Sequence, residues 1–232
     1  MRINKYIASQ TELSRRKADD MIKQGKVKVN SEILTDFSYD VKNMDEVEVD
    51  GEIISDKKIN KYYYLFNKPK GVLSSVSDPF DRPCIREYFP PEIDVYPVGR
   101  LDMDSTGLLI VTNDGELTNK LTHPKNHIPK KYLVTLDGRL SDVQMEKFRN
   151  GILLEGKLTM PAEIELYDFS AATYKVVLFE GKKRQIRNMI AELGRNVKEL
   201  QRIAIGKVKL GTIKEGNYRK LTEQEKEYFF NL

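Results

Sequence analysis

The sequence predicts an α+β protein with a small N-terminal domain followed by a larger one, and three observations support this fold class. Of its 232 residues, 40% are apolar and 32% are charged, an ordinary composition for a folded globular chain. A polar stretch predicts a linker at 55–60, between domains 1–54 and 61–232. Beyond it, strand-like runs are short and alternate with few long helices. These runs lie at 132–136, 152–154, 174–179 and 203–210.

The N-terminal domain contains a helix whose first turn is basic. Ser14 is a good N-cap for a helix over 15–24. Arg15, Arg16 and Lys17 follow the cap, where positive charge opposes the helix dipole. Because free backbone N–H groups point to the same place, the cluster predicts binding of an anion such as phosphate.

A short basic strand is expected after this helix, because Lys26 and Lys28 alternate with two valines. Residues 1–30 carry eight Lys or Arg against three Asp or Glu, and residues 181–220 carry twelve against three. Each run alone fits a solvated face. Two such runs in a chain of net charge only +4 favour a polyanionic partner.

The larger domain begins with an aromatic-rich strand at 62–66, followed by a turn containing proline and glycine. Further strands are expected at 95–98 and 108–112, and a helix at 116–121. The loop between these two strands, residues 99–107, has a glycine at each end.

This loop carries the first candidate chemistry: Arg100, Asp102 and Asp104. A carboxylate on a loop at strand ends is accessible to a ligand. The structural alternative is that both aspartates accept hydrogen bonds from backbone N–H groups of the loop. Spacing alone favours this second interpretation.

A second helix with a basic start is expected over 183–193. Arg184 and Arg187 lie near its N-terminus, so an anion is expected there too. In the following strand, the apolar positions change from odd to even after Gly206. This change predicts a β-bulge at that glycine.

The sequence offers little material for metal, disulfide or membrane functions. Its single cysteine, Cys84, excludes an intrachain disulfide and suits a reducing compartment. The two histidines, His123 and His127, lack a nearby thiol or clear carboxylate partner, so no metal site is expected. There is no P-loop or dinucleotide fingerprint, no run of ~20 apolar residues and no apolar signal region. We therefore expect a cytoplasmic protein without a cofactor.

Two groups of motifs resemble known families. Residues 14–30 resemble the alpha-L RNA-binding domain, with the match covering about 1–52. Gly-Arg-Leu-Asp at 99–102, followed by Ser-Thr-Gly-Leu-Leu at 105–109, resembles the characteristic loop of pseudouridine synthases. Other segments that resemble this family are 65–71, 130–134, 181–187 and 200–206. The combination is most similar to the branch of the family that modifies small-subunit ribosomal RNA, and the large-subunit branch shares the motifs.

The resemblance implies a mixed, mainly antiparallel sheet in two halves, with an RNA-binding cleft between them. It implies that Asp102 is the catalytic group and that Asp104 shapes the loop. Tyr132 is expected to pack on the uracil and to help remove its C5 proton. Arg187 is expected to keep Asp102 ionised as its charge partner. Arg100 is expected to hold the target nucleotide out of the base stack.

The expected RNA-binding residues combine the basic segments with these motifs. They are Arg15, Arg16, Lys17, Lys26, Lys28, Arg100, Lys182, Lys183, Arg184 and Arg202.

The expected function is isomerisation of a specific uridine to pseudouridine in ribosomal RNA, most similar to the small-subunit enzymes. Large-subunit RNA is the alternative substrate. The partner would be ribosomal RNA or an assembling ribosomal subunit, bound by a monomer. Two other functions stay open. A non-catalytic RNA-binding assembly factor would explain the basic segments, and a sugar hydrolase would use Asp102 and Asp104 as paired carboxylates.

Overall fold

The computed structural model describes residues 1–54 and 60–232, which form two compact units, Met1–Lys61 and Tyr62–Leu232. Of the linker predicted at 55–60, all but Asn60 lies outside the described residues. Within the described part of the chain, no helix is both long and apolar enough to cross a membrane.

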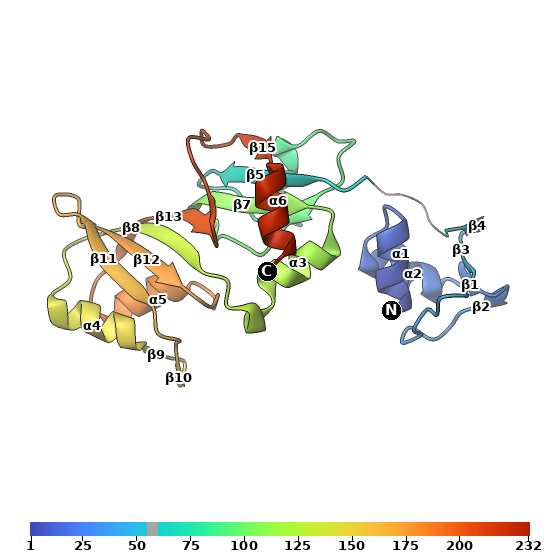
Figure 1. The fold of residues 1–232 in the computed structure, drawn as a ribbon, viewed down its shortest axis with the longest axis horizontal. Coiled ribbons are helices and arrows are strands. Elements are labelled where there is room, and N and C mark those ends of the chain that lie inside the picture. Colours follow the sequence, from blue (N-terminus) through green and yellow to red (C-terminus); the bar gives the residue numbers. More distant parts are fainter. Residues whose placement is uncertain (55–59) are drawn as a thin grey trace. The chain divides into compact units, whose positions relative to one another are not determined.

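The first unit packs two helices on a small sheet (Figure 1). The helices are α1 (Ile3–Gln10) and α2 (Arg15–Lys23). The strands, in the order β2-β1-β3-β4 across the sheet, are β1 (Val27–Val29), β2 (Glu32–Ile33), β3 (Val47–Val49) and β4 (Glu52–Ile53). The predicted cap is present, because the Ser14 side chain accepts a hydrogen bond from the Lys17 backbone N–H.

In the second unit, nine of the described strands form one sheet. Its main order is β11-β12-β8-β13-β7-β5-β15, with β14 paired to β13 and β6 paired to β7 (Figure 1). The strands are β5 (Tyr63–Lys68), β6 (Tyr96–Pro97), β7 (Thr106–Thr112), β8 (Lys130–Leu136), β11 (Glu163–Asp168), β12 (Thr173–Leu178), β13 (Val197–Ile205), β14 (Val208–Lys209) and β15 (Tyr218–Lys220). All its pairings are antiparallel except β13 with β7. The predicted mixed, mainly antiparallel α+β fold is confirmed.

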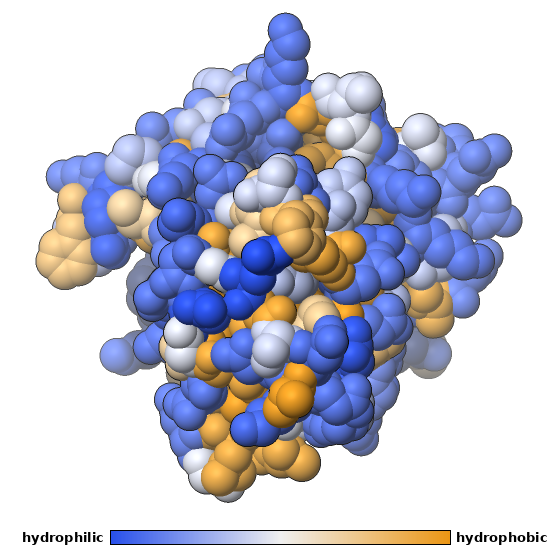
Figure 2. Space-filling model, turned by 90° about the vertical axis from the view of Figure 1, so that its left-hand side faces the viewer, coloured by the Kyte–Doolittle hydropathy of each residue, from blue (hydrophilic) through white to orange (hydrophobic). Residues whose placement is uncertain are grey.

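Short helices and one small hairpin complete this unit. The helices are α3 (Gly115–Thr122), α4 (Asp142–Asn150), α5 (Gln185–Glu192) and α6 (Glu223–Phe230), with 3-10 turns η1 (Ile85–Tyr88) and η2 (Pro124–Asn126). The hairpin pairs β9 (Leu153–Leu154) with β10 (Lys157–Leu158). Figure 2 views the side of the molecule that carries α4 and this hairpin, where apolar side chains interrupt the hydrophilic surface. The exposed Val143, Leu153 and Leu158 belong to these two elements.

The junction between the two halves of the sheet is narrow. The parallel pairing of β13 with β7 joins only Gln201 to Thr106 and Arg202 to Gly107. Gly107 has φ +102°, and a Cβ there would meet the backbone carbonyl oxygen of Arg202 and lie 2.8 Å from its nitrogen. Only glycine permits this close approach, so the glycine positions the loop before β7 against β13.

Two expectations from the sequence need correction. The change of burial after Gly206 is not a bulge: Gly206 and Lys207 form the turn of a hairpin, in which Ile205 pairs with Val208. The burial pattern changes earlier, within β13: Arg202, Ala204 and Ile205 are buried, and the register with β8 shifts between Arg202 and Ala204. The helix expected from Lys183 begins at Gln185, because Arg184 adopts a left-handed conformation with φ 50° that cannot continue a helix.

Candidate active site

A basic cleft of about 340 Å³ lies in the second unit, beside the loop before β7. Its walls come from that loop, from the chain between α3 and β8, and from the segment leading into α5. Lysine and arginine side chains outnumber carboxylates in the lining. The basic residues are Arg100, Lys130, Lys182, Lys183, Arg184 and Arg202, and the acidic ones are Asp102 and Glu180. The cleft therefore favours a polyanionic ligand with a carboxylate at its wall.

The loop that carries Asp102 is held by backbone contacts on both sides. The Leu101 N–H donates to Ser74 Oγ at 3.0 Å, and this hydroxyl donates to the Leu101 carbonyl at 2.8 Å. The Gly71 N–H donates to the Met103 carbonyl at 2.8 Å. The turn after β5, together with Ser74 beyond it, thus fixes the backbone on each side of Asp102.

Asp102 itself is half-buried and lines the cleft. Its carbonyl accepts a hydrogen bond from the Ser105 N–H at 3.0 Å, which closes the loop. No described group hydrogen-bonds or ion-pairs with its carboxylate. The carboxylate is therefore available to a ligand.

Asp104, in contrast, is the partner of two arginines. Arg184 Nη1 and Nη2 lie 3.3 and 3.1 Å from its two carboxylate oxygens, and Arg187 Nη2 lies 3.3 Å from Oδ2. Arg187 also donates to the carbonyls of Asp104 and Val197. In this structure the ion pair of Arg187 is therefore with Asp104, and the expected effect of Arg187 on the ionisation of Asp102 stays a prediction. The turn at Met103 and Asp104, closed by the hydrogen bond from the Ser105 N–H to the Asp102 carbonyl, separates the two side chains. Asp104 therefore reaches the start of α5 while Asp102 lines the cleft.

Charge and burial oppose each other in this cluster. Burial alone would raise the pKa of Asp104, but the hydrogen bond from Arg184 and the charges of both arginines outweigh it and lower the pKa. Burial lowers the pKa of Arg187, whose side chain is 12% exposed, while the negative charges of Asp104 and Asp102 act in the opposite direction. Asp102 therefore lies within the electrostatic range of Arg187 although the two are not paired.

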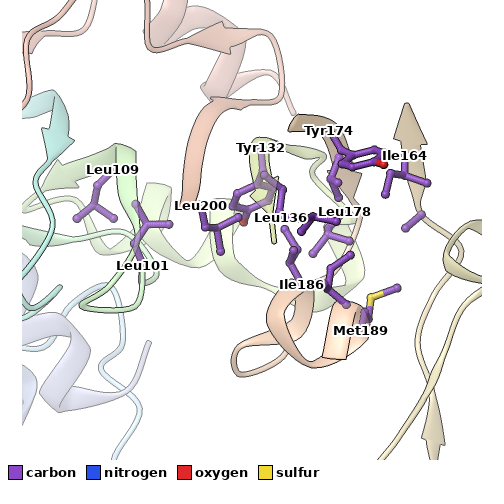
Figure 3. Packing of buried hydrophobic residues seen from close by; sticks show 14 of the residues in the cluster. Leu101, Leu109, Tyr132, Leu136, Ile164, Tyr174, Leu178, Ile186, Met189 and Leu200 are labelled. Carbon is purple, nitrogen blue, oxygen red and sulfur yellow. The ribbon is translucent and has the colours of Figure 1, made fainter. Parts of the chain in front are cut away.

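Tyr132 lies on β8 at the floor of the cleft and is 8% exposed. Its ring packs beside Leu200, with Leu136, Leu178 and Ile186 nearby, as Figure 3 shows. A side chain packed on so many sides has little rotational freedom. The tyrosine therefore offers a fixed aromatic surface to a ligand in the cleft.

The predicted RNA-binding residues of the cleft fall into two groups. Arg100, Lys182, Lys183 and Arg184 are exposed at its rim. Arg202 is 3% exposed and its Nε donates to the Leu108 carbonyl at 2.7 Å, while its Nη2 is buried and has no hydrogen-bond partner among the described residues. The burial of Arg202 favours a role in the floor of the cleft over a contact with RNA at the surface.

The predicted RNA-binding residues of the first unit also fall into two groups, those without a charged partner and those in ion pairs. Arg15, Arg16 and Lys17 are exposed at the start of α2, and among the described residues only Arg15 has a hydrogen-bond partner for its side chain, the neutral Asn4. Lys26 and Lys28 already form ion pairs with Asp50 at 3.1 Å and Glu48 at 2.8 Å. The strand face predicted to be basic is therefore partly neutralised by the neighbouring strand.

Sequence reasoning missed two lysines near the site. Lys130 lines the cleft, and burial, together with the charge of Arg202, lowers its pKa. Lys68 is fully buried, and its Nζ donates to the carbonyls of Pro69 and Val72 at 2.8 Å. Burial lowers the pKa of Lys68 to about 8, against the opposing charges of Asp104, Glu215 and Asp102. Both lysines lie in motifs that were recognised, but nothing in the sequence distinguishes a buried lysine from an exposed one.

Comparison with known proteins matches each of the two units to a known family. The sequence model of the RNA pseudouridylate synthase family matches residues 62–192, and that of the S4 domain matches residues 1–47. The chain is 37% identical to the ribosomal large subunit pseudouridine synthase B of Bacillus subtilis, with 97% of this chain and 93% of the relative aligned. It is 35% identical to the ribosomal small subunit pseudouridine synthase A of Escherichia coli, with 97% and 98% aligned. A crystal structure of a pseudouridylate synthase, 35% identical, covers 99% of both chains with a TM-score of 0.73.

Proposed function

Because the chain belongs to the RNA pseudouridylate synthase family and carries an S4 domain, we propose that it converts a uridine of ribosomal RNA to pseudouridine with Asp102 as the essential carboxylate. The observation that supports this assignment best is the half-buried Asp102, which has no partner among the described residues and lies in a cleft whose other charges are mainly positive. A polyanion with a reacting group at its centre fits this distribution of charge.

The reaction is an isomerisation. The C1′–N1 glycosidic bond breaks, a C1′–C5 bond forms, the C5 proton leaves and N1 gains a proton. A carboxylate can start this sequence by attack on the sugar or on the base, or by removal of the C2′ proton, and the three routes stay open. In each of them Asp102 must be ionised and unpaired.

The other site residues have roles that fit their positions. Tyr132, which lines the cleft, would pack against the uracil ring and help remove the C5 proton. Arg187 would act on Asp102 through its charge at longer range than an ion pair. Arg100, exposed two residues before Asp102, would replace the extruded uridine in the RNA stack.

We propose small-subunit ribosomal RNA, free or in an assembling subunit, as the first substrate to test, and large-subunit RNA as the alternative. The similarity to the Escherichia coli small-subunit enzyme, of which 98% aligns with 97% of this chain, supports the first. The similarity to the Bacillus subtilis large-subunit enzyme keeps the second open. Mapping pseudouridines in both ribosomal RNAs of a deletion strain distinguishes them, since one site should disappear from one RNA.

The catalytic proposal is tested by release of tritium from ribosomal RNA labelled at uracil C5. Wild-type protein should release tritium, and Asp102→Asn should release none while it keeps its stability and its affinity for RNA. Wild-type protein that binds RNA without tritium release would instead support a non-catalytic assembly factor. Turnover by Asp102→Asn would remove this aspartate from the mechanism.

A further inference from the structure

Phe80 is the most exposed aromatic side chain in the described part of the chain, at 76%. It lies in the loop between β5 and η1, which contributes no residue to the lining of the cleft. A single exposed ring is common on protein surfaces, so the surroundings of Phe80 decide whether it is a candidate binding surface.

Hydrogen bonds connect the loop that carries Phe80 to the loop that carries Asp102. Its two ends are joined, because the Leu73 N–H donates to the Pro83 carbonyl at 2.8 Å and the Ile85 N–H donates to the Leu73 carbonyl at 3.1 Å. Ser74, at the base of the loop, exchanges two hydrogen bonds with the backbone of Leu101. The base of the loop thus contacts the residue that precedes Asp102.

Within the loop, Asp78 fixes the backbone of Phe80. Its carboxylate accepts from the Phe80 N–H at 3.0 Å and from Arg82 Nε and Nη2 at 3.0 and 2.7 Å. The Asp78 side chain is only 6% exposed while that of Arg82 is 48% exposed, so only the carboxylate end of this pair is sheltered from water. The Arg82 guanidinium in turn lies over the Phe80 ring, 5.3 Å from its centre. The ring is exposed but its position is set in advance.

We propose that Phe80, supported by Arg82, is a stacking platform for an RNA base that neighbours the target nucleotide. The proposal rests on the proposed function only in that RNA enters the cleft beside Asp102. Asp78 neutralises the charge of Arg82. Phe80 and Arg82 together therefore present an aromatic face but no unpaired positive charge that would bind a phosphate. Unpaired bases stack on such rings whatever their sequence, which suits a position that orients the RNA near the reacting uridine.

A second exposed ring in the same unit provides a matched control. Phe169 is 66% exposed, and the Arg139 guanidinium lies 4.0 Å from its centre. It belongs to the connection between β11 and β12, and no hydrogen bond between described residues joins that connection to the loop of Asp102. The two sites share exposure and cation–π geometry and differ in their link to the active site.

The chain contains no tryptophan, so Phe80→Trp and Phe169→Trp each introduce a unique fluorophore at an exposed position. The probes are a twelve-nucleotide oligoadenylate and an abasic RNA with the same number of phosphates. We expect oligoadenylate to quench the fluorescence of Phe80→Trp strongly, abasic RNA to quench it little, and Phe169→Trp to respond to neither.

Phe80→Ala should weaken oligoadenylate binding by about fivefold or more, which is the usual contribution of one stacked base. The dependence of its affinity on salt should stay unchanged, because the variant keeps every contact to phosphate.

Three results would overturn the platform: equal quenching by both RNAs, equal responses of the two tryptophan variants, or no binding of oligoadenylate by the wild type. Unchanged oligoadenylate affinity in Phe80→Ala would also overturn it and leave the ring to a protein partner. The measurement needs no turnover and can be repeated in an Asp102→Asn background. Quenching without tritium release from C5-labelled RNA would therefore contradict the catalytic proposal alone, and tritium release without quenching would contradict the platform alone.

Discussion

Asp102 and Asp104 are two residues apart and have different surroundings. Asp102 faces the cleft without a partner among the described residues, while Asp104 receives Arg184 and Arg187. A carboxylate held by two cations is a poor nucleophile and a poor base, because its charge is already satisfied. This difference supports Asp102 as the reacting group and makes Asp104 the residue that holds the start of α5 against the loop.

The first prediction concerns activity at saturating RNA. Asp104→Asn should lower the single-turnover rate by about tenfold, which corresponds to the loss of one charged hydrogen bond. It should not abolish turnover, because the amide still accepts from Arg184 and the Asp104 carbonyl still accepts from Arg187. Complete loss of activity in Asp104→Asn, with turnover retained in Asp102→Asn, would reverse the two assignments.

The second prediction concerns stability. Arg187 is mostly buried and donates to two backbone carbonyls, so Arg187→Met should cost about 1–3 kcal/mol of unfolding free energy. Arg184 is 42% exposed, and Arg184→Met should cost less than about 1 kcal/mol. Urea denaturation of both variants measures the difference. Equal losses would mean that the buried contacts of Arg187 do not support the fold.

The third prediction concerns the dependence of stability on pH. In the folded protein the pKa of Asp104 lies below 3.8, the ordinary value of an aspartate carboxyl group. A carboxylate with a lowered pKa stabilises the fold above its unfolded pKa, and this contribution is lost as the pH falls through the folded value. The difference in unfolding free energy between wild type and Asp104→Asn should therefore be constant near neutral pH and shrink below pH 3.8. A difference that grows on acidification would contradict the ion-pair assignment.

At the scale of elements, the contact between β7 and β13 positions the catalytic loop. It is the parallel pairing that joins the halves of the sheet, and Gly107 makes it possible. The same strand leads directly from the loop of Asp102, so a shift of β7 would move the carboxylate.

The fourth prediction uses two glycines with positive φ. Gly107→Ala places a methyl group against the Arg202 backbone, whereas Gly156→Ala, in the β9–β10 turn, has no neighbour within 4 Å of the new Cβ. Both variants incur backbone strain of about 1–2 kcal/mol. Only Gly107→Ala should lose more than this and also lose activity. Thermal unfolding measures the loss of stability and tritium release measures the loss of activity. Equal losses in the two variants would show that the junction between β7 and β13 accommodates a methyl group.

At the scale of the whole molecule, positive charge lies in two places, at the start of α2 and around the cleft. The sequence pattern counts every lysine equally, but the structure shows that Lys26 and Lys28 already have acidic partners. A paired lysine releases fewer counterions when RNA binds, so Lys26 and Lys28 should contribute less to affinity than the start of α2.

The fifth prediction compares these two clusters of the S4 domain. Replacing Arg15, Arg16 and Lys17 by alanine should flatten the plot of log affinity for ribosomal RNA against log salt, by about 0.7 for each phosphate that these side chains neutralise. Replacing Lys26 and Lys28 by alanine should change the slope less. Binding titrations over a range of salt concentrations measure both, and an unchanged slope in the first variant would remove the phosphate site from α2.

The sequence by itself determined the fold class, the S4 domain, the family and the capped helix after Ser14. These depend on local patterns and on ordered motifs, which lie within short stretches of chain. It also singled out the loop of Asp102 and the basic start of α5, because their residue types are unusual for their positions.

Only the tertiary structure decided which charges meet. That Arg187 pairs with Asp104, that Arg202 and Lys68 are buried, and that Gly206 forms a hairpin all depend on segments far apart in sequence or on the path of the chain. A charged residue has the same local pattern whether it faces water, a carboxylate or a backbone carbonyl. Its partner is set by distance in the folded chain, because the strength of an ion pair depends on separation and burial and not on sequence order.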